Sequence, residues 1–92
     1  MVNISKVVKR DGTMERFSRT KIKQSIHKAL MHAHRKDHHT ADMLTSQVTS
    51  ILQKRYKKGL VEVETIRHTV EYVLVKNKFS KTAKAYILYR YS

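Results

Sequence analysis

The sequence predicts a domain of the α+β class, because strand-like runs near its start are followed by long stretches with helical periodicity. The strand-like runs are 4–9 and 13–17, and Arg10, Asp11 and Gly12 separate them. An Asp-Gly pair supplies the positive-φ backbone that joins antiparallel neighbours. The chain is therefore expected to begin with a β-hairpin.

Two amphipathic helices are expected after the hairpin. Ser18 is a suitable N-cap for the first helix. The apolar stripe of this helix consists of Ile22, Ile26, Ala29, Leu30 and Ala33. Thr40 is the expected cap of the second helix, with Asp42 in its first turn and Gly59 closing it after Tyr56. The second stripe consists of Leu44, Val48, Ile51 and Leu52. Each helix should therefore bury one face.

A short third strand at 60–63 should lead into a third helix. The stripe of this helix consists of Ile66, Val70, Val73 and Leu74. Ser80 is the expected cap of a fourth helix at 81–91. Because 85–89 is apolar nearly all round, the fourth helix is expected to pack on two sides, between the other helices and the sheet. The chain has no proline, repeat or linker composition, so a single domain over 1–92 is expected.

The charge of the chain is strongly positive. Its 20 lysine and arginine residues and 7 acidic residues leave a formal charge of +13, which favours an anionic partner: nucleic acid, a nucleotide, an acidic protein or a membrane surface. A membrane-surface helix would need a broad aromatic face, and the chain has no tryptophan and two phenylalanines. The absence of cysteine and of a long apolar run makes the cytoplasm the expected location.

Basic residues gather where acidic ones would be ordinary. A helix N-terminus carries partial positive charge, yet the first helix begins with Arg19, Lys21 and Lys23. A phosphate bound there would reverse the repulsion, and Lys9 and Arg10 at the hairpin end could approach the same place. The alternative is that long basic side chains simply extend into water on a very basic protein. The residues themselves leave both explanations open.

Other candidate chemistry is sparse. Both glycines serve turns, so the two glycine-rich phosphate-binding motifs are excluded. Four histidines, His32, His34, His38 and His39, are interpreted as a polar connection between helices, and no metal site is expected. Asp11 and Glu15 lack a nucleophile or metal beside them, so no catalytic residue is expected. Four tyrosines could stack on bases, but helix packing is favoured for them: Tyr72, Tyr86, Tyr89 and Tyr91.

Three segments carry a resemblance to a known family. The runs "VVKRDGTMERFSRTKI", "VEVETIRHTVEYVLVKN" and "AKAYILYR" resemble the ATP-cone domain, over residues 4–91. This nucleotide-sensing module is found in many ribonucleotide reductases and in the bacterial repressor of their genes. The resemblance implies a four-helix bundle covered by a small three-stranded sheet. It also implies that ATP or dATP binds under the hairpin and changes oligomeric state without catalysis.

The resemblance also implies roles for eight residues. The basic positions that contact phosphates in the family correspond to Lys9, Arg10 and Lys21. Val7 would flank the nucleotide, while Glu15 and Ser18 would approach the base or sugar. The other side of the pocket would be closed by Val63 and Arg67. Magnesium arriving with ATP would be held by phosphates and water, because Glu15 is the expected nearby carboxylate.

Two features depart from the family pattern. The 92 residues include no reductase catalytic domain and no cysteine-based DNA-binding ribbon, so a regulated partner would be a separate protein or the rest of a longer chain. The charge also exceeds what one nucleotide needs. The alternative function is therefore a small basic nucleic-acid-binding protein, for example one that acts in transcription.

Overall fold

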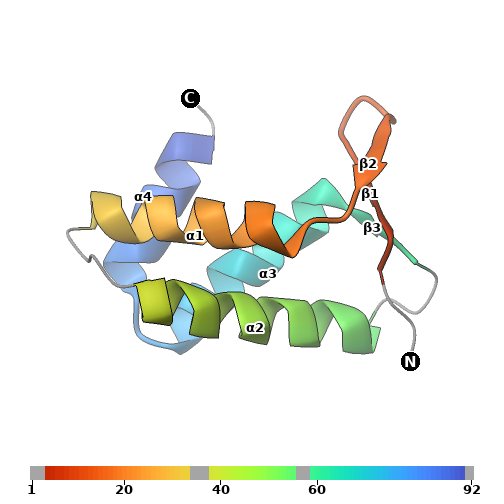
Figure 1. Cartoon of the computed structure of the whole chain (residues 1–92). Coiled ribbons are helices and arrows are strands. Elements are labelled where there is room, and N and C mark those ends of the chain that lie inside the picture. The colour runs from red at the N-terminus through yellow and green to blue at the C-terminus, as the bar shows by residue number, and fades with distance from the viewer. Residues whose placement is uncertain (1–3, 34–37, 56–58, 91–92) are drawn as a thin grey trace.

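The computed structural model describes residues 4–33, 38–55 and 59–90, except for the side chains of His38, Tyr89 and Arg90. Within this part the strands are β1 (Lys6–Val8), β2 (Met14–Arg16) and β3 (Leu60–Glu62). The helices are α1 (Arg19–His32), α2 (His38–Arg55), α3 (Val63–Lys76) and α4 (Ser80–Arg90). Figure 1 shows the sheet at one end of the helical layer, next to the start of α1. The α+β class is confirmed.

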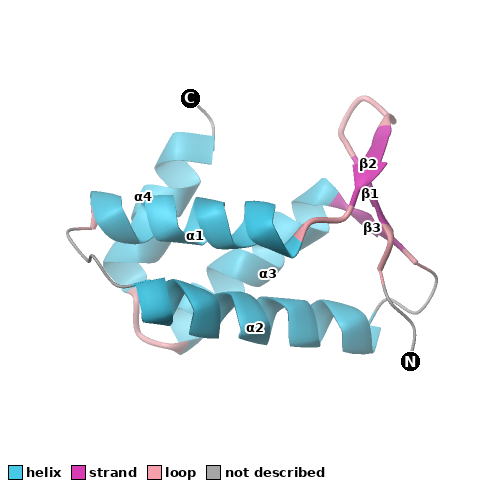
Figure 2. Ribbon diagram, viewed as in Figure 1, coloured by secondary structure: helices cyan, strands magenta, loops and turns pink. Residues whose placement is uncertain are grey.

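The three strands form one mixed sheet in the order β2-β1-β3. The antiparallel pair of β1 and β2 places Val7 opposite Glu15, which confirms the hairpin. The parallel pair of β1 and β3 places Val7 opposite Val61. A parallel pair needs a long crossover, and here α1 and α2 lie between the two strands in the chain (Figure 2). Helix α3 begins at Val63, directly after the last residue of β3.

The hairpin turn differs in one detail from the prediction. The Gly12 N–H donates to the Lys9 carbonyl at 2.9 Å, and the Lys9 N–H donates to the Thr13 carbonyl at 2.8 Å. Gly12 has a φ of 86°, whereas Asp11 does not have a positive φ. Asp11 instead accepts hydrogen bonds from the backbone and the hydroxyl of Thr13. One glycine, rather than an Asp-Gly pair, therefore supplies the left-handed residue.

The helices pack as a bundle whose core follows the predicted stripes. Helix α1 packs on α2 and α4, and α3 also packs on these two helices. The stripe residues with exposures of 0 or 1% are Ile26, Ala29, Leu30, Leu44, Val48, Leu52, Val70, Val73 and Leu74. Ile4, Val7 and Val61 join the same core from the sheet end. Burial of this apolar surface is the main force that holds the sheet against the helices.

Two helices start earlier than predicted, α2 by three residues and α4 by one. Helix α2 already includes Thr40, so Asp42 lies beyond its first turn. Helix α4 includes Ser80, and the Phe79 carbonyl accepts from the Ala83 N–H at 2.9 Å. In both cases the helix extends toward the N-terminus and includes the polar residue that was expected to cap it. Capping preference is weak compared with tertiary packing. The predicted end of α2 at Tyr56 lies outside the described residues.

The predicted packing of α4 on two sides is also wrong. Tyr86 and Ala83 are buried, but Ile87 is 37% exposed and Leu88 is 70% exposed. Helix α4 packs on α1 and α3, and Figure 1 shows it away from the sheet. Its second apolar side therefore faces solvent. None of the helices in the described segments is long and apolar enough to cross a membrane.

Candidate functional site

A cleft lies where the hairpin meets the starts of α1 and α3, and it has a volume of about 240 Å³. We call it the hairpin cleft. Six of the eight predicted site residues line it: Val7, Glu15, Ser18, Lys21, Val63 and Arg67. Phe17, Ile22, Ile66 and Tyr86 provide much of its apolar wall. The cleft therefore combines an apolar wall with charged groups from three elements.

The other two predicted residues lie in an adjoining hollow. This hollow, the turn depression, has a volume of about 350 Å³ and is lined by Val8, Lys9, Arg10, Gly12, Glu62, Val63 and Glu64. Val63 borders both the hairpin cleft and the turn depression. All eight predicted residues are thus brought to two neighbouring hollows on the sheet side of the bundle.

Glu15 connects the hairpin with α1. Its Oε2 atom lies 3.5 Å from the Lys9 ammonium and 3.5 Å from the Lys21 ammonium. The antiparallel register places Glu15 opposite Val7 on β1, so the carboxylate stands beside the cleft. The Glu15 carboxylate therefore holds two lysines, one from the hairpin and one from α1, close together.

Glu64, which lines the turn depression, connects the hairpin turn with α3. Its Oε1 atom accepts hydrogen bonds from Arg10 Nε and Arg67 Nη1, both at 2.8 Å, and lies 2.7 Å from Arg10 Nη2. These bonds, from Arg10 first, hold the pKa of Glu64 below its ordinary value. Glu64 was not predicted from the sequence, in which Glu15 was the expected nearby carboxylate. The spacing of Glu64 and Arg67 on one helix could have indicated their pairing, but not the contact with Arg10.

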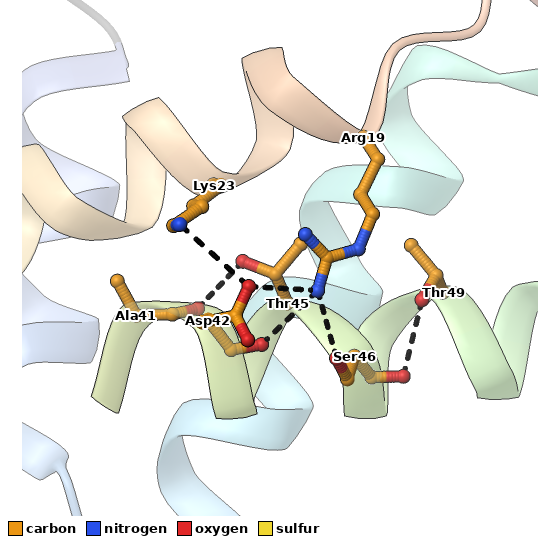
Figure 3. A network of polar contacts seen from close by, with 7 residues as sticks. All are labelled: Arg19, Lys23, Ala41, Asp42, Thr45, Ser46 and Thr49. Atoms are coloured by element: carbon orange, nitrogen blue, oxygen red, sulfur yellow. Dashed lines mark hydrogen bonds and ion pairs between the residues drawn. The ribbon is translucent and has the colours of Figure 1, made fainter. Parts of the chain in front are cut away.

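The first turn of α1 explains part of the basic cluster. Ser18 caps the helix as predicted, because its hydroxyl accepts from the Lys21 N–H at 3.2 Å. Arg19 Nη2 donates to Asp42 Oδ1 at 3.1 Å and to Ser46 Oγ at 2.8 Å on α2 (Figure 3). The hydrogen bond and charge of Arg19, together with the nearby Lys23, lower the pKa of Asp42.

This network decides between the two explanations that the sequence left open for Arg19 and Lys23. Arg19 and Lys23 point to Asp42 and bind α1 to α2 instead (Figure 3). Lys21 is the basic residue of the turn that lines the hairpin cleft. Because α1 in its described length has no acidic residue in the first turn, Lys21 and the helix dipole leave this end electropositive.

The other predicted features are partly placed by the structure. In the described segments no group of three or more His, Cys, Asp and Glu side chains could hold a metal ion. His34 and the side chain of His38 lie outside those segments. Tyr86 is buried, as expected, but the prediction of a packing role for Tyr72 is wrong, since it is 54% exposed. The side chain of Tyr89 and all of Tyr91 lie outside the described part.

A cavity larger than these two hollows lies away from the predicted site. It is a groove of about 550 Å³ between α2 and α3, and none of the eight predicted residues lines it. We call it the α2–α3 groove. It was not predicted from the sequence, because its two walls belong to helices whose packing joins residues distant in the chain.

The fold and the hairpin cleft define a small α+β module with an electropositive hollow beneath a hairpin. The family model of the ATP cone domain matches residues 5–92, so the chain belongs to this family of nucleotide-binding regulatory domains. The chain is also similar to the vitamin B12-dependent ribonucleoside-diphosphate reductase of Thermoplasma acidophilum, with 37% identity over 92 positions. The match covers 95% of the chain but 12% of the length of that reductase.

Proposed function

We propose that the chain is a single non-catalytic module that binds ATP or dATP across the hairpin cleft and the turn depression. The observation that carries this proposal is the convergence of four basic residues from the turn, α1 and α3 on two adjoining hollows: Lys9, Arg10, Lys21 and Arg67. Ligand pockets usually have volumes of about 300–1,000 Å³. The hairpin cleft, at about 240 Å³, lies below this range, and the turn depression, at about 350 Å³, lies near its lower end. A nucleotide would therefore extend across both hollows.

The triphosphate would lie near the turn and the start of α1. There Lys9, Arg10 and Lys21 would supply charge, and the first N–H groups of the helix would supply donors. The adenine ring would lie against the apolar wall of the hairpin cleft, which includes Val7 and Val63. Glu15 and Ser18, in the same cleft, are the groups we assign to the base or sugar.

Carboxylates in the site would compete with the ligand. Glu15 and Glu64 already hold the basic side chains through ion pairs of 2.7–3.5 Å. Phosphates that bound Lys9 and Arg10 would displace these carboxylates, so part of the binding free energy offsets the lost ion pairs. Magnesium would accompany the phosphates and keep much of its water, as is usual for nucleotide-bound Mg²⁺.

The output of binding is a change in association. A +13 chain repels its own copies, and about four triphosphate charges at the hairpin would reduce this repulsion locally. We propose that occupancy controls oligomerisation or the activity of a partner such as a ribonucleotide reductase in the cytoplasm. That partner could be a separate protein or the remainder of a longer chain.

Thermal unfolding with a panel of nucleotides tests the binding proposal. ATP or dATP at about a hundredfold excess over Kd should stabilise the fold by about 2.7 kcal/mol, and GTP should stabilise it less. Equal stabilisation by all three nucleotides would contradict an adenine site. Sedimentation velocity with and without dATP, at about 0.15 M salt, tests the output. An unchanged sedimentation coefficient at full occupancy would contradict self-association and leave control of a partner as the output.

A further inference from the structure

The α2–α3 groove has a second concentration of basic side chains. Helices α2 and α3 run in opposite directions, because Gln47 and Asn77 exchange hydrogen bonds of 2.8 and 3.4 Å while Arg55 and Thr65 line the same groove. Lys54 and Arg55 therefore lie at the Thr65 end, and Lys76 lies at the other end. The rise of an α-helix places these ends about 16 Å apart.

The charge of this groove is uncompensated within the described residues. No carboxylate lines it, although it includes Lys54, Arg55 and Lys76. Glu15, Asp42 and Glu64 form ion pairs near the sheet or between α1 and α2, and none of the three lines the groove. A second copy of this chain would therefore bring little negative charge to the groove.

The helix dipole explains part of this arrangement but not all of it. Lys54, Arg55 and Lys76 occupy the last turns of their helices, where cations are ordinarily favourable. The dipole does not require an exposed aromatic ring beside them. Tyr72 lines the groove with 54% of its surface exposed, and the Lys76 ammonium lies 5.6 Å from its ring centroid. An open aromatic ring between separated cations is characteristic of sites that bind single-stranded nucleic acids.

We propose that the α2–α3 groove binds single-stranded nucleic acid. Lys54 and Arg55 would contact phosphates at one end of the bound strand and Lys76 a phosphate at the other end. Tyr72 would stack on a base after the Lys76 ammonium moves from its ring. At the spacing of about 3.4 Å per phosphate along one strand of a duplex, 16 Å corresponds to about five nucleotides. A single triphosphate is too compact to reach both charged ends. This site shares no lining residue with the hairpin cleft, so it does not depend on the proposed nucleotide site.

The test measures fluorescence anisotropy of a labelled oligothymidylate of about 12 nucleotides over a series of salt concentrations. The groove variant is Lys54→Ala with Lys76→Ala. The matched control is Lys81→Ala with Lys84→Ala, which removes the same charge from exposed positions of α4. The groove variant should bind more weakly than the control, and the slope of log K against log salt should fall in magnitude by about 1.4. Tyr72→Leu should weaken binding roughly tenfold through lost stacking.

Several results would overturn the proposal. Equal weakening by the groove variant and the control would show that diffuse charge, and not the groove, attracts the strand. Unchanged affinity in Tyr72→Leu would remove the stacking contact. Competition by polyglutamate as effective as that by unlabelled oligothymidylate would identify an acidic polypeptide as the partner instead. A Lys9→Ala, Arg10→Ala variant that binds the strand more weakly than the groove variant would move the site to the hairpin.

Discussion

The double replacement Lys9→Ala, Arg10→Ala is the sharpest test of the hairpin cleft and turn depression. Both side chains are at least half exposed at the hairpin end, and both form ion pairs with carboxylates. Surface ion pairs contribute little to stability, so the fold should persist. The double replacement should therefore weaken nucleotide binding and leave the stability of the fold nearly unchanged.

The expected magnitude follows from the contacts. A charge-assisted hydrogen bond contributes about 1.5–3 kcal/mol. Because Lys9 must leave Glu15 at 3.5 Å and Arg10 must leave Glu64 at 2.7 Å, we take the lower value for each. Loss of both contacts then costs about 3 kcal/mol, which weakens the Kd for ATP roughly a hundredfold.

Isothermal titration calorimetry with ATP and dATP measures this change. The groove variant Lys54→Ala, Lys76→Ala is the matched control, because it lowers the net charge by the same two units and lies outside the cleft. Its affinity for ATP should stay within a few-fold of wild type. If the hairpin variant bound ATP as tightly as this control while retaining a cooperative melting transition, the assignment of the phosphates to the turn would be refuted.

Three further predictions follow from single side chains. Ser18→Ala removes the α1 cap and should cost about 1 kcal/mol, which lowers the melting temperature in circular dichroism by about 4–8 °C. Glu64→Gln removes the charge that competes for Arg10, so ATP affinity in calorimetry should rise, and a weaker affinity would contradict that competition. Because contacts with Arg19 lower the pKa of Asp42, its carboxylate stabilises the fold above about pH 4, and this stability is lost as pH falls through the lowered pKa. Asp42→Asn should therefore reduce the urea midpoint near pH 7 and change it little near pH 2, whereas equal effects at both would exclude an ionic role.

The family match supports the reading of the hairpin motif, while the roles of the eight residues stay predictions. The relative positions of Val7, Lys9, Arg10 and Glu15 follow from local sequence, because the four residues belong to one hairpin whose turn fixes their spacing. Contacts from α3 were harder to infer. Arg67 was expected to close the pocket. A role for its neighbour Glu64 was not predicted, because the contact between Glu64 and Arg10 joins residues 54 positions apart.

The sequence by itself determined the helices, the hairpin and the core stripes. Apolar spacing is a local property, and Ile26, Leu52 and Leu74 are all fully buried as it predicted. Tertiary structure alone decided which charges meet. The sequence left open whether Arg19 and Lys23 serve a phosphate or extend into water, and the packing of α1 on α2 brings both to Asp42. The energy of an ion pair depends on distance and solvent exposure, and for residues far apart in the chain these quantities exist only once the helices have packed.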